Sequence, residues 1–141
     1  VVCGSVAAVA RSQLDAVRQA LADGSLRNVA VHTTDVPASP TLPLQPQRLE
    51  PRVAATLVHG IDWANAGVVV AVGGDTAAAL LGDLPCPVGG YAALGMPWSL
   101  PLGTDGPLLV TKAGAFGDQQ SLVNVIRSLV GSLVGMAGGA E

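Results

Sequence analysis

The run Gly67–Val72 (GVVVAV), followed at once by the turn Gly73–Thr76 (GGDT), constrains the fold more than any other part of this chain. Consecutive valines favour a strand, and a strand without polar alternation is one that is covered on both faces. Such strands occur in parallel sheets flanked by helices. We therefore expect a central strand, a glycine turn and then a helix over Ala77–Leu81.

The rest of the chain repeats this alternation. Further strands are expected at Val1–Cys3, Asn28–Thr33 and Leu108–Thr111, and further helices at Ala8–Ala22, Arg52–Asn65 and along the stripe Leu122, Val125, Ile126, Leu129 and Leu133. Residues 37–51 hold five prolines and are expected to form a loop; residues 84–104 hold four prolines and four glycines and are expected to be irregular. The order β-α-β-α-β-α-β-α predicts one α/β domain over residues 1–141, a three-layer Rossmann-like fold with a mostly parallel sheet covered by helices on both faces.

Composition narrows the function classes. Half of the residues are hydrophobic and 12% are charged, which is typical of a globular core and excludes disorder. A net charge of -3, no basic cluster and four aromatic residues argue against nucleic acid or an anionic membrane as a partner.

Cys3 and Cys86 have no metal-binding spacing and fit a reduced cytoplasm, so we expect a cytoplasmic protein without a metal site. The chain starts at Val1, inside an apolar run and without an initiator methionine, which indicates a piece of a longer protein.

Three glycine turns follow expected strands. They are Gly4-Ser5, the GGDT turn and the segment Lys112–Asp118 (KAGAFGD). Ligands of open α/β sheets bind at the carboxyl ends of the strands, where glycine admits a phosphate and helix N-termini attract it by about 0.3–1 kcal/mol. Lys112 is the only lysine beside six arginines, and an ammonium suits a phosphate as a point charge. The three turns therefore predict a phosphate or nucleotide site.

Each of these residues also has a simpler interpretation. Asp75 or Thr76 fits a helix N-cap, Ser5 a cap, Lys112 a solvated surface charge, Phe116 a core ring, Asp118 the N-cap of the last helix, and His32 and His59 structural positions. A carboxylate at Asp75 would repel a phosphate unless Mg²⁺ or a ribose hydroxyl lay between them.

Four motifs then carry a resemblance to a known family. They are GSV with Gln13 at residues 4–13, VAVGGDTA at 70–77, GMPW at 95–98 and LVTKAGAFGD at 109–118. In this order they resemble the C-terminal nucleotide-binding domain of the four-carbon acid sugar kinase family, and the likeness spans essentially the whole chain. The resemblance implies ATP- and Mg²⁺-dependent phosphorylation of sugar acids such as threonate, erythronate or 3-oxo-tetronate. It also implies an N-terminal domain, absent here, that holds the sugar acid and the catalytic aspartate.

Taken position by position, the resemblance implies a set of ATP contacts and no catalytic residue in this chain. The contacts are Ser5, Gly73, Gly74, Asp75, Thr76, Gly114 and Gly117, with Lys112 as the family lysine. The sequence departs from the family pattern at Ala7, Ala10 and Ala113, where hydroxyl residues are usual, and at Gly89-Gly90-Tyr91, where an acidic residue is usual.

Two other functions stay open. One is a non-catalytic module that binds a nucleotide or phosphorylated metabolite for regulation, or that contributes a homodimer surface. The other is a different kinase with a GG-acidic-Thr turn, such as a glycerate kinase, which leaves the KAGAFGD segment unexplained. If the chain is the ATP-binding half of a kinase, it holds ATP or ADP while the other domain presents the acceptor hydroxyl, and alone it does not turn over.

Overall fold

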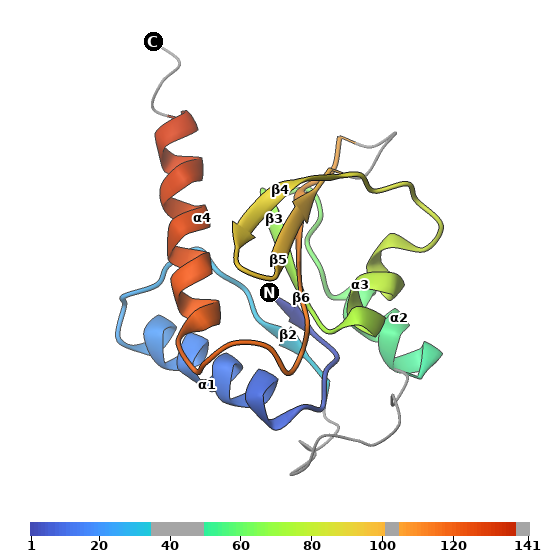
Figure 1. The fold of residues 1–141 in the computed structure, drawn as a ribbon, viewed down its shortest axis with the longest axis horizontal. Coiled ribbons are helices and arrows are strands. Elements are labelled where there is room, and N and C mark those ends of the chain that lie inside the picture. Colours follow the sequence, from blue (N-terminus) through green and yellow to red (C-terminus); the bar gives the residue numbers. More distant parts are fainter. Residues whose placement is uncertain (35–49, 101–104, 138–141) are drawn as a thin grey trace.

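The computed structural model describes residues 1–34, 50–100 and 105–137, which build three layers (Figure 1). In chain order the elements are β1 (Val2–Cys3), α1 (Ala8–Ala22), β2 (His32–Thr33), α2 (Pro51–His59), β3 (Val68–Val72), α3 (Gly74–Leu81), β4 (Val88–Ala93), β5 (Met96–Ser99), β6 (Leu108–Lys112) and α4 (Ser121–Ala137). The predicted α/β class is confirmed.

One six-stranded sheet has the order β2-β1-β3-β6-β5-β4. Its first four strands are parallel, and β5 and β4 join antiparallel to β6. The valine-rich β3 lies between β1 and β6, in the interior position that its unbroken apolar pattern predicts. Cys3, Val72 and Lys112 form one row across these three strands, so their carboxyl ends finish at the same level.

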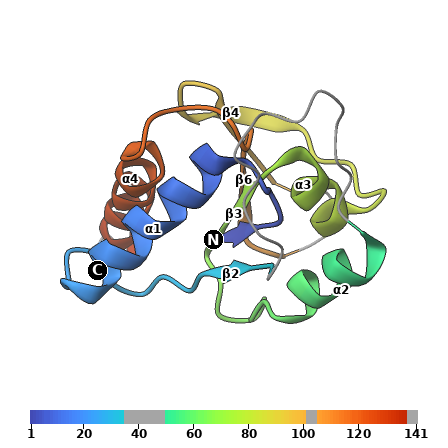
Figure 2. The same ribbon diagram turned by 90° about the horizontal axis from the view of Figure 1, so that it is seen from below.

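Helices cover both faces of the sheet (Figure 2). On one face, α1 and α4 pack over a core that includes Leu14, Val17, Val70, Val110 and Ile126. On the other face, α2 and α3 cover a smaller core that includes Leu57, Val69 and Leu109. The alternation of side chains along β3 and β6 explains this division, because Val69 and Val70 point to opposite faces.

The expectation of irregular structure over residues 84–104 was wrong for most of that range, since β4 and β5 form a hairpin over residues 88–99. Residues 101–104 of this range lie outside the described residues. The glycines that suggested a loop leave room for a side chain from the neighbouring strand. A Cβ on Gly90 would lie 2.8 Å from the indole Nε1 of Trp98, and one on Gly89 would overlap the same ring. The strand therefore carries glycine because a bulky side chain crosses it.

The other boundaries differ by a few residues. The helix at Ala8–Ala22 is confirmed, whereas the strand expected at Asn28–Thr33 covers only His32–Thr33, and the helix expected to reach Asn65 ends at His59. The helix expected from Ala77 begins at Gly74. Most of the loop expected at 37–51 lies outside the described residues. Within the described ranges, no helix has both the length and the apolarity needed to cross a membrane.

Candidate functional site

The three glycine turns lie side by side at the carboxyl ends of neighbouring strands. They follow β1, β3 and β6, whose last residues share one row of the sheet. The amide of Gly73 donates to the carbonyl of Lys112 at 2.8 Å, which ties the second turn to the end of β6. The topology thus builds the single edge that the sequence predicts, from segments about forty and seventy residues apart in the chain.

Thr76 joins the first turn to the second. Its side chain is 2% exposed, and its hydroxyl donates to the carbonyl of Val72 at 2.9 Å while accepting from the amide of Gly4 at 2.8 Å. Both roles of the hydroxyl are therefore used inside the protein. Thr76 therefore links the first and second turns through its side chain, and its predicted contact with ATP stays a prediction.

Ser5 lies against the glycines of the other two turns. A Cβ on Gly73 would be 3.3 Å from Ser5 Cβ, and a Cβ on Gly114 would be 2.9 Å from the same atom and would overlap Ser5 Oγ. Gly73 also has φ +103°, a conformation that side chains rarely adopt. These two glycines are thus required by close approach and by backbone geometry.

Lys112 is a buried cation. The simpler interpretation as a solvated surface charge was wrong, because the residue is 2% exposed. Its ammonium donates to the carbonyl of Ala113 at 2.7 Å, and in the part of the chain that the structure describes it makes no ion pair. Burial lowers the pKa of Lys112 from its ordinary value of 10.5, opposed by the neighbouring Cys3. An ammonium has three donors, so this one retains capacity for an anion.

The N-terminus of α3 is the most open part of this edge. Gly74 and Asp75 are exposed, and a Cβ on Gly74 would meet nothing within 4 Å. No side chain caps α3, so the helix-cap interpretation of Asp75 and Thr76 was wrong. The first amides of a helix have no intrahelical partners and attract anions, which leaves an accessible donor group next to the GGDT turn.

The third turn is arranged differently from the other two. Gly117 has φ +87°, and a Cβ there would be 2.7 Å from Ser121 Oγ at the start of α4. Asp118 accepts hydrogen bonds from the amide of Gln120 and the hydroxyl of Ser121, both at 2.9 Å, and these bonds lower the pKa of its carboxyl. The amide of Asp118 in turn donates to Ser121 Oγ at 2.9 Å, so Asp118 makes hydrogen bonds of the N-cap kind immediately before α4, as the N-cap interpretation predicts.

Gln13, which ends the first family motif but received no role in the sequence analysis, also lies in this region. It is fully buried on α1, and its amide nitrogen donates to the carbonyls of Phe116 at 3.0 Å and Asp118 at 2.6 Å. One sequence signal for its burial was its position as a polar residue among Ala10, Leu14 and Val17 on the buried face of the helix. That position also closes the GSV motif at residues 4–13.

A cavity of about 460 Å³ adjoins the third turn. Its walls come from the β4–β5 turn, including Leu94, from Phe116 and Gly117, and from Asn124 and Ser128 on α4. Phe116 is 40% exposed and packs beside Gly95, so the interpretation of this residue as a core ring was wrong. The glycine edge thus continues into a hollow of mixed polarity.

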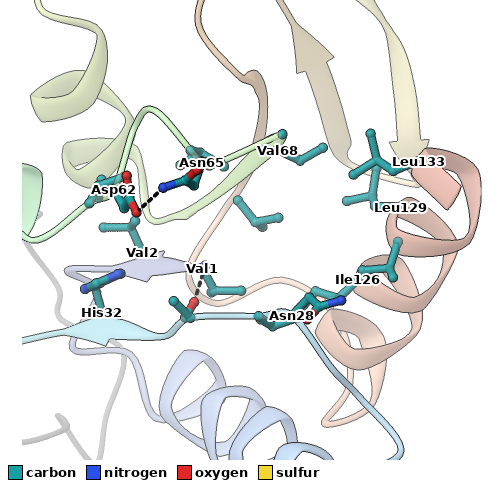
Figure 3. A pocket seen from close by; sticks show the side chains of 18 of the residues that line it. Val1, Val2, Asn28, His32, Asp62, Asn65, Val68, Ile126, Leu129 and Leu133 are labelled. Atoms are coloured by element: carbon teal, nitrogen blue, oxygen red, sulfur yellow. Dashed lines mark hydrogen bonds between the residues drawn. The ribbon is translucent and has the colours of Figure 1, made fainter. Parts of the chain in front are cut away.

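A second cavity, of about 550 Å³, lies at the opposite edge of the sheet (Figure 3). It is bounded by Val1 and Val68 at the amino ends of their strands, by Ile126, Leu129 and Leu133 of α4, and by the polar residues Asn28, His32, Asp62 and Asn65. Asn65 donates to the carboxylate of Asp62 at 2.8 Å. The larger hollow is therefore remote from all three glycine turns.

Among the described residues, no group of three or more His, Cys, Asp or Glu side chains is placed to hold a metal ion. Cys3 and Cys86 are both free thiols. Cys3 is buried, and this burial raises the pKa of its thiol. Neither thiol belongs to a cluster of metal-ligand side chains among the residues that the structure describes.

Comparison with known proteins finds relatives in structure only. No family model matches the chain, and no curated protein matches it. A Bordetella bronchiseptica protein with domain of unknown function DUF1537, solved as a domain-swapped dimer with bound citrate, aligns at TM-scores of 0.65 and 0.61 in two crystal forms, with 24% and 23% identity. In both forms the alignment covers 90% of this chain.

Two further neighbours have the same fold. A Haemophilus influenzae DUF1537 protein aligns over 92% of the chain with a TM-score of 0.61 and 15% identity. A Salmonella typhimurium LT2 protein, provisionally named a tRNA synthase, aligns over 90% with a TM-score of 0.57 and 14% identity. This chain spans 38–39% of the length of these proteins. The fold is thus one found in DUF1537 proteins.

Proposed function

We propose that this chain is the ATP-binding domain of a kinase that phosphorylates a four-carbon sugar acid of the threonate, erythronate or 3-oxo-tetronate type. The observation that carries the proposal is the convergence of three glycine turns at the ends of β1, β3 and β6, beside the uncapped start of α3. Amide donors and a helix dipole then lie at one end of the sheet, next to the strand end that carries the buried Lys112, which suits a polyphosphate.

The donor set also fits a magnesium ion that arrives with the nucleotide. Mg²⁺ keeps several waters and is held by one or two carboxylates together with substrate phosphates. Asp75 is an exposed carboxylate in the first turn of α3. When bound, the ion would neutralise charge that develops on the phosphates, and Asp75 is the residue of this chain that would help to hold it.

The sugar acid and its catalytic base belong, in this proposal, to a separate N-terminal domain. The structural neighbours are more than twice as long as this chain, and the family resemblance implies a catalytic aspartate in an N-terminal domain. Phosphoryl transfer depends mostly on positioning and charge stabilisation, so two domains can divide the nucleotide and the acceptor between them. The chain alone then binds ATP or ADP without turnover.

A non-catalytic module is the second candidate. Alanine occupies positions 7, 10 and 113, which removes hydroxyl groups beside the first and third turns. Such a module would bind a nucleotide or phosphorylated metabolite for regulation. Either function is compatible with a homodimer, since Leu133 and Val134 are exposed apolar residues on α4 and the Bordetella protein forms a domain-swapped dimer.

Thermal unfolding with separate additions of Mg-ATP, Mg-ADP and threonate tests the proposal. A ligand at 100 times its Kd stabilises the folded state by about 2.7 kcal/mol, which raises the Tm of a domain of this size by several degrees. We expect a shift with both nucleotides and none with threonate. No shift with either nucleotide would contradict the proposal, and a shift with phosphorylated metabolites alone would favour the regulatory module.

Gly74→Val gives the sharpest test of the location. The added side chain enters open space at the start of α3, so the fold is preserved while the approach of a phosphate is blocked. Gly131→Val is the matched control, because a Cβ at this helical glycine of α4 also meets nothing within 4 Å. Loss of nucleotide binding in the first variant and retention in the second are expected; equal affinities would place the site elsewhere.

A further inference from the structure

Gln13 stands apart from the rest of the buried face of α1. Its neighbours on that face are Ala10, Leu14 and Val17, and all are apolar. Its side-chain oxygen Oε1 is buried and is the one buried side-chain polar atom among the described residues that lacks a hydrogen-bond partner. An unpaired buried acceptor lowers stability, so packing alone does not explain an amide at this position.

The amide nitrogen of Gln13, Nε2, makes two hydrogen bonds. Nε2 donates to the carbonyls of Phe116 and Asp118, at 3.0 and 2.6 Å, across more than a hundred residues of sequence. These two carbonyls lie on either side of Gly117. In Figure 1 the connection from β6 to α4 passes beside α1, where this contact is made.

Holding a carbonyl also orients the amide of the same peptide unit. The described segment that holds the third turn has only trans peptide bonds, and in a planar trans peptide the N–H points opposite to the C=O. Because the carbonyls of Phe116 and Asp118 point toward Gln13, the amides of Gly117 and Gln119 point away from it. Neither of these two amides has a hydrogen-bond partner among the described residues.

We propose that Gln13 is a positioning residue that fixes the third glycine turn so that the amides of Gly117 and Gln119 face an anionic ligand. The inference rests on the proposed phosphate site and adds two donors to it, one of them at Gln119. A glutamine suits this task because its amide nitrogen supplies two hydrogens for two carbonyls, whereas a carboxylate supplies none.

Gln13→Met is the first test, with Gln19→Met as its control on the exposed face of the same helix. Methionine keeps the length of the side chain and removes both hydrogen bonds and the unpaired oxygen. We expect Gln13→Met to stay folded and to bind Mg-ATP about tenfold more weakly, the loss expected for one misplaced donor to a charged group. Gln19→Met should bind as the unchanged protein does. An unchanged Kd in a folded Gln13→Met protein would overturn the inference.

Amide resonances of the whole chain separate this inference from the kinase proposal. In the unchanged protein, the resonances of Gly117 and Gln119 should shift on titration with Mg-ATP, and separately with pyrophosphate; in Gln13→Met they should shift much less. A response to pyrophosphate but not to Mg-ATP would contradict the nucleotide proposal and support the role of Gln13. Resonances of Gly117 and Gln119 that respond to neither ligand would overturn that role.

Gln13→Glu gives a readout that a purely structural role would not move. The ionised carboxylate cannot donate to the two carbonyls, but its protonated form returns one donor. Relative to the unchanged protein at each pH, the affinity of this variant for pyrophosphate should therefore rise as the pH falls. If Gln13→Met does not fold, this pH profile decides the question, and a flat profile would contradict the inference.

Discussion

The two ends of the parallel strands differ in the groups that surround them. At the carboxyl edge, three turns are tied by Thr76 and by the bond from Gly73 to Lys112. At the amino edge, apolar side chains of β3 and α4 border a larger cavity of about 550 Å³. Cavity volume favours a ligand site at the amino ends of the strands. The converging hydrogen-bond donors and the buried Lys112 favour a ligand site at the carboxyl ends. We give the hydrogen-bond donors more weight than the cavity volume, because polar groups fix the orientation of a ligand.

The largest loss of stability is expected from Gly73→Ala, since this glycine lies where the first and second turns pack most closely. The side chain would meet φ +103° together with 3.3 Å approaches to Ser5 and Thr76, a combination that should cost on the order of 3 kcal/mol. Chemical denaturation measures the loss. Gly74→Ala is the neighbouring control, with open space and a change within about 0.5 kcal/mol. Equal losses at the two glycines would contradict the described turn.

Gly114→Ala should cost about 2 kcal/mol, because the new methyl group overlaps the side chain of Ser5. Adding Ser5→Gly removes the overlap and should restore much of the lost stability. A double-mutant cycle in urea measures this coupling, which we expect to be about 1 kcal/mol or more. Strictly additive losses would show that the first and third turns are not in contact.

Lys112→Met is expected to separate stability from binding. The free energy of unfolding should rise by about 1 kcal/mol, since an apolar side chain replaces a buried ammonium that makes no ion pair with any described residue. Mg-ATP affinity should fall about tenfold. Denaturation and calorimetry measure the two effects. Retained affinity would exclude Lys112 from the site.

Lys112 should also make the free energy of unfolding depend on pH. Its pKa is lowered in the folded protein, so the unfolded chain binds the proton more tightly. Stability should therefore rise as the pH increases through the interval between the lowered pKa and 10.5. Lys112→Met should lose this rise, and a variant that keeps the full slope would assign it to other groups.

The smallest effect is expected at the amino edge. Leu133 borders the large cavity and is 42% exposed, so Leu133→Ala should change stability by less than about 1 kcal/mol and leave nucleotide affinity unchanged. Calorimetry with Mg-ATP checks this. A marked loss of affinity would move the ligand to the larger cavity and reverse the comparison of the two edges.

Much of the fold was predictable from local patterns. The valine run placed β3 in the sheet interior, and the apolar spacing gave α1 its observed bounds, Ala8–Ala22. The hairpin of β4 and β5 was not predictable in this way. Its glycines are explained by the ring of Trp98, which lies eight or nine residues further along the chain and crosses the strand only after pairing.

The candidate site divides in a similar manner. The positions of Ser5, Gly73 and Gly114 at one edge followed from the order of strands and turns, and their contacts agree with it. The burial of Lys112 and the bonds from Gln13 to the third turn did not follow from any local pattern. A lone lysine or glutamine has the same appearance in a sequence whether it is exposed or enclosed.

By itself, then, the sequence determined the class of fold and the edge at which glycine turns gather, because hydrophobic period and glycine placement act over a few residues at a time. Only the tertiary structure decided which turns are in contact, that Lys112 is buried, and which backbone amides lack a hydrogen-bond partner among the described residues. Those properties depend on contacts between segments as much as one hundred residues apart, and such contacts exist only once the sheet and both helix layers have formed.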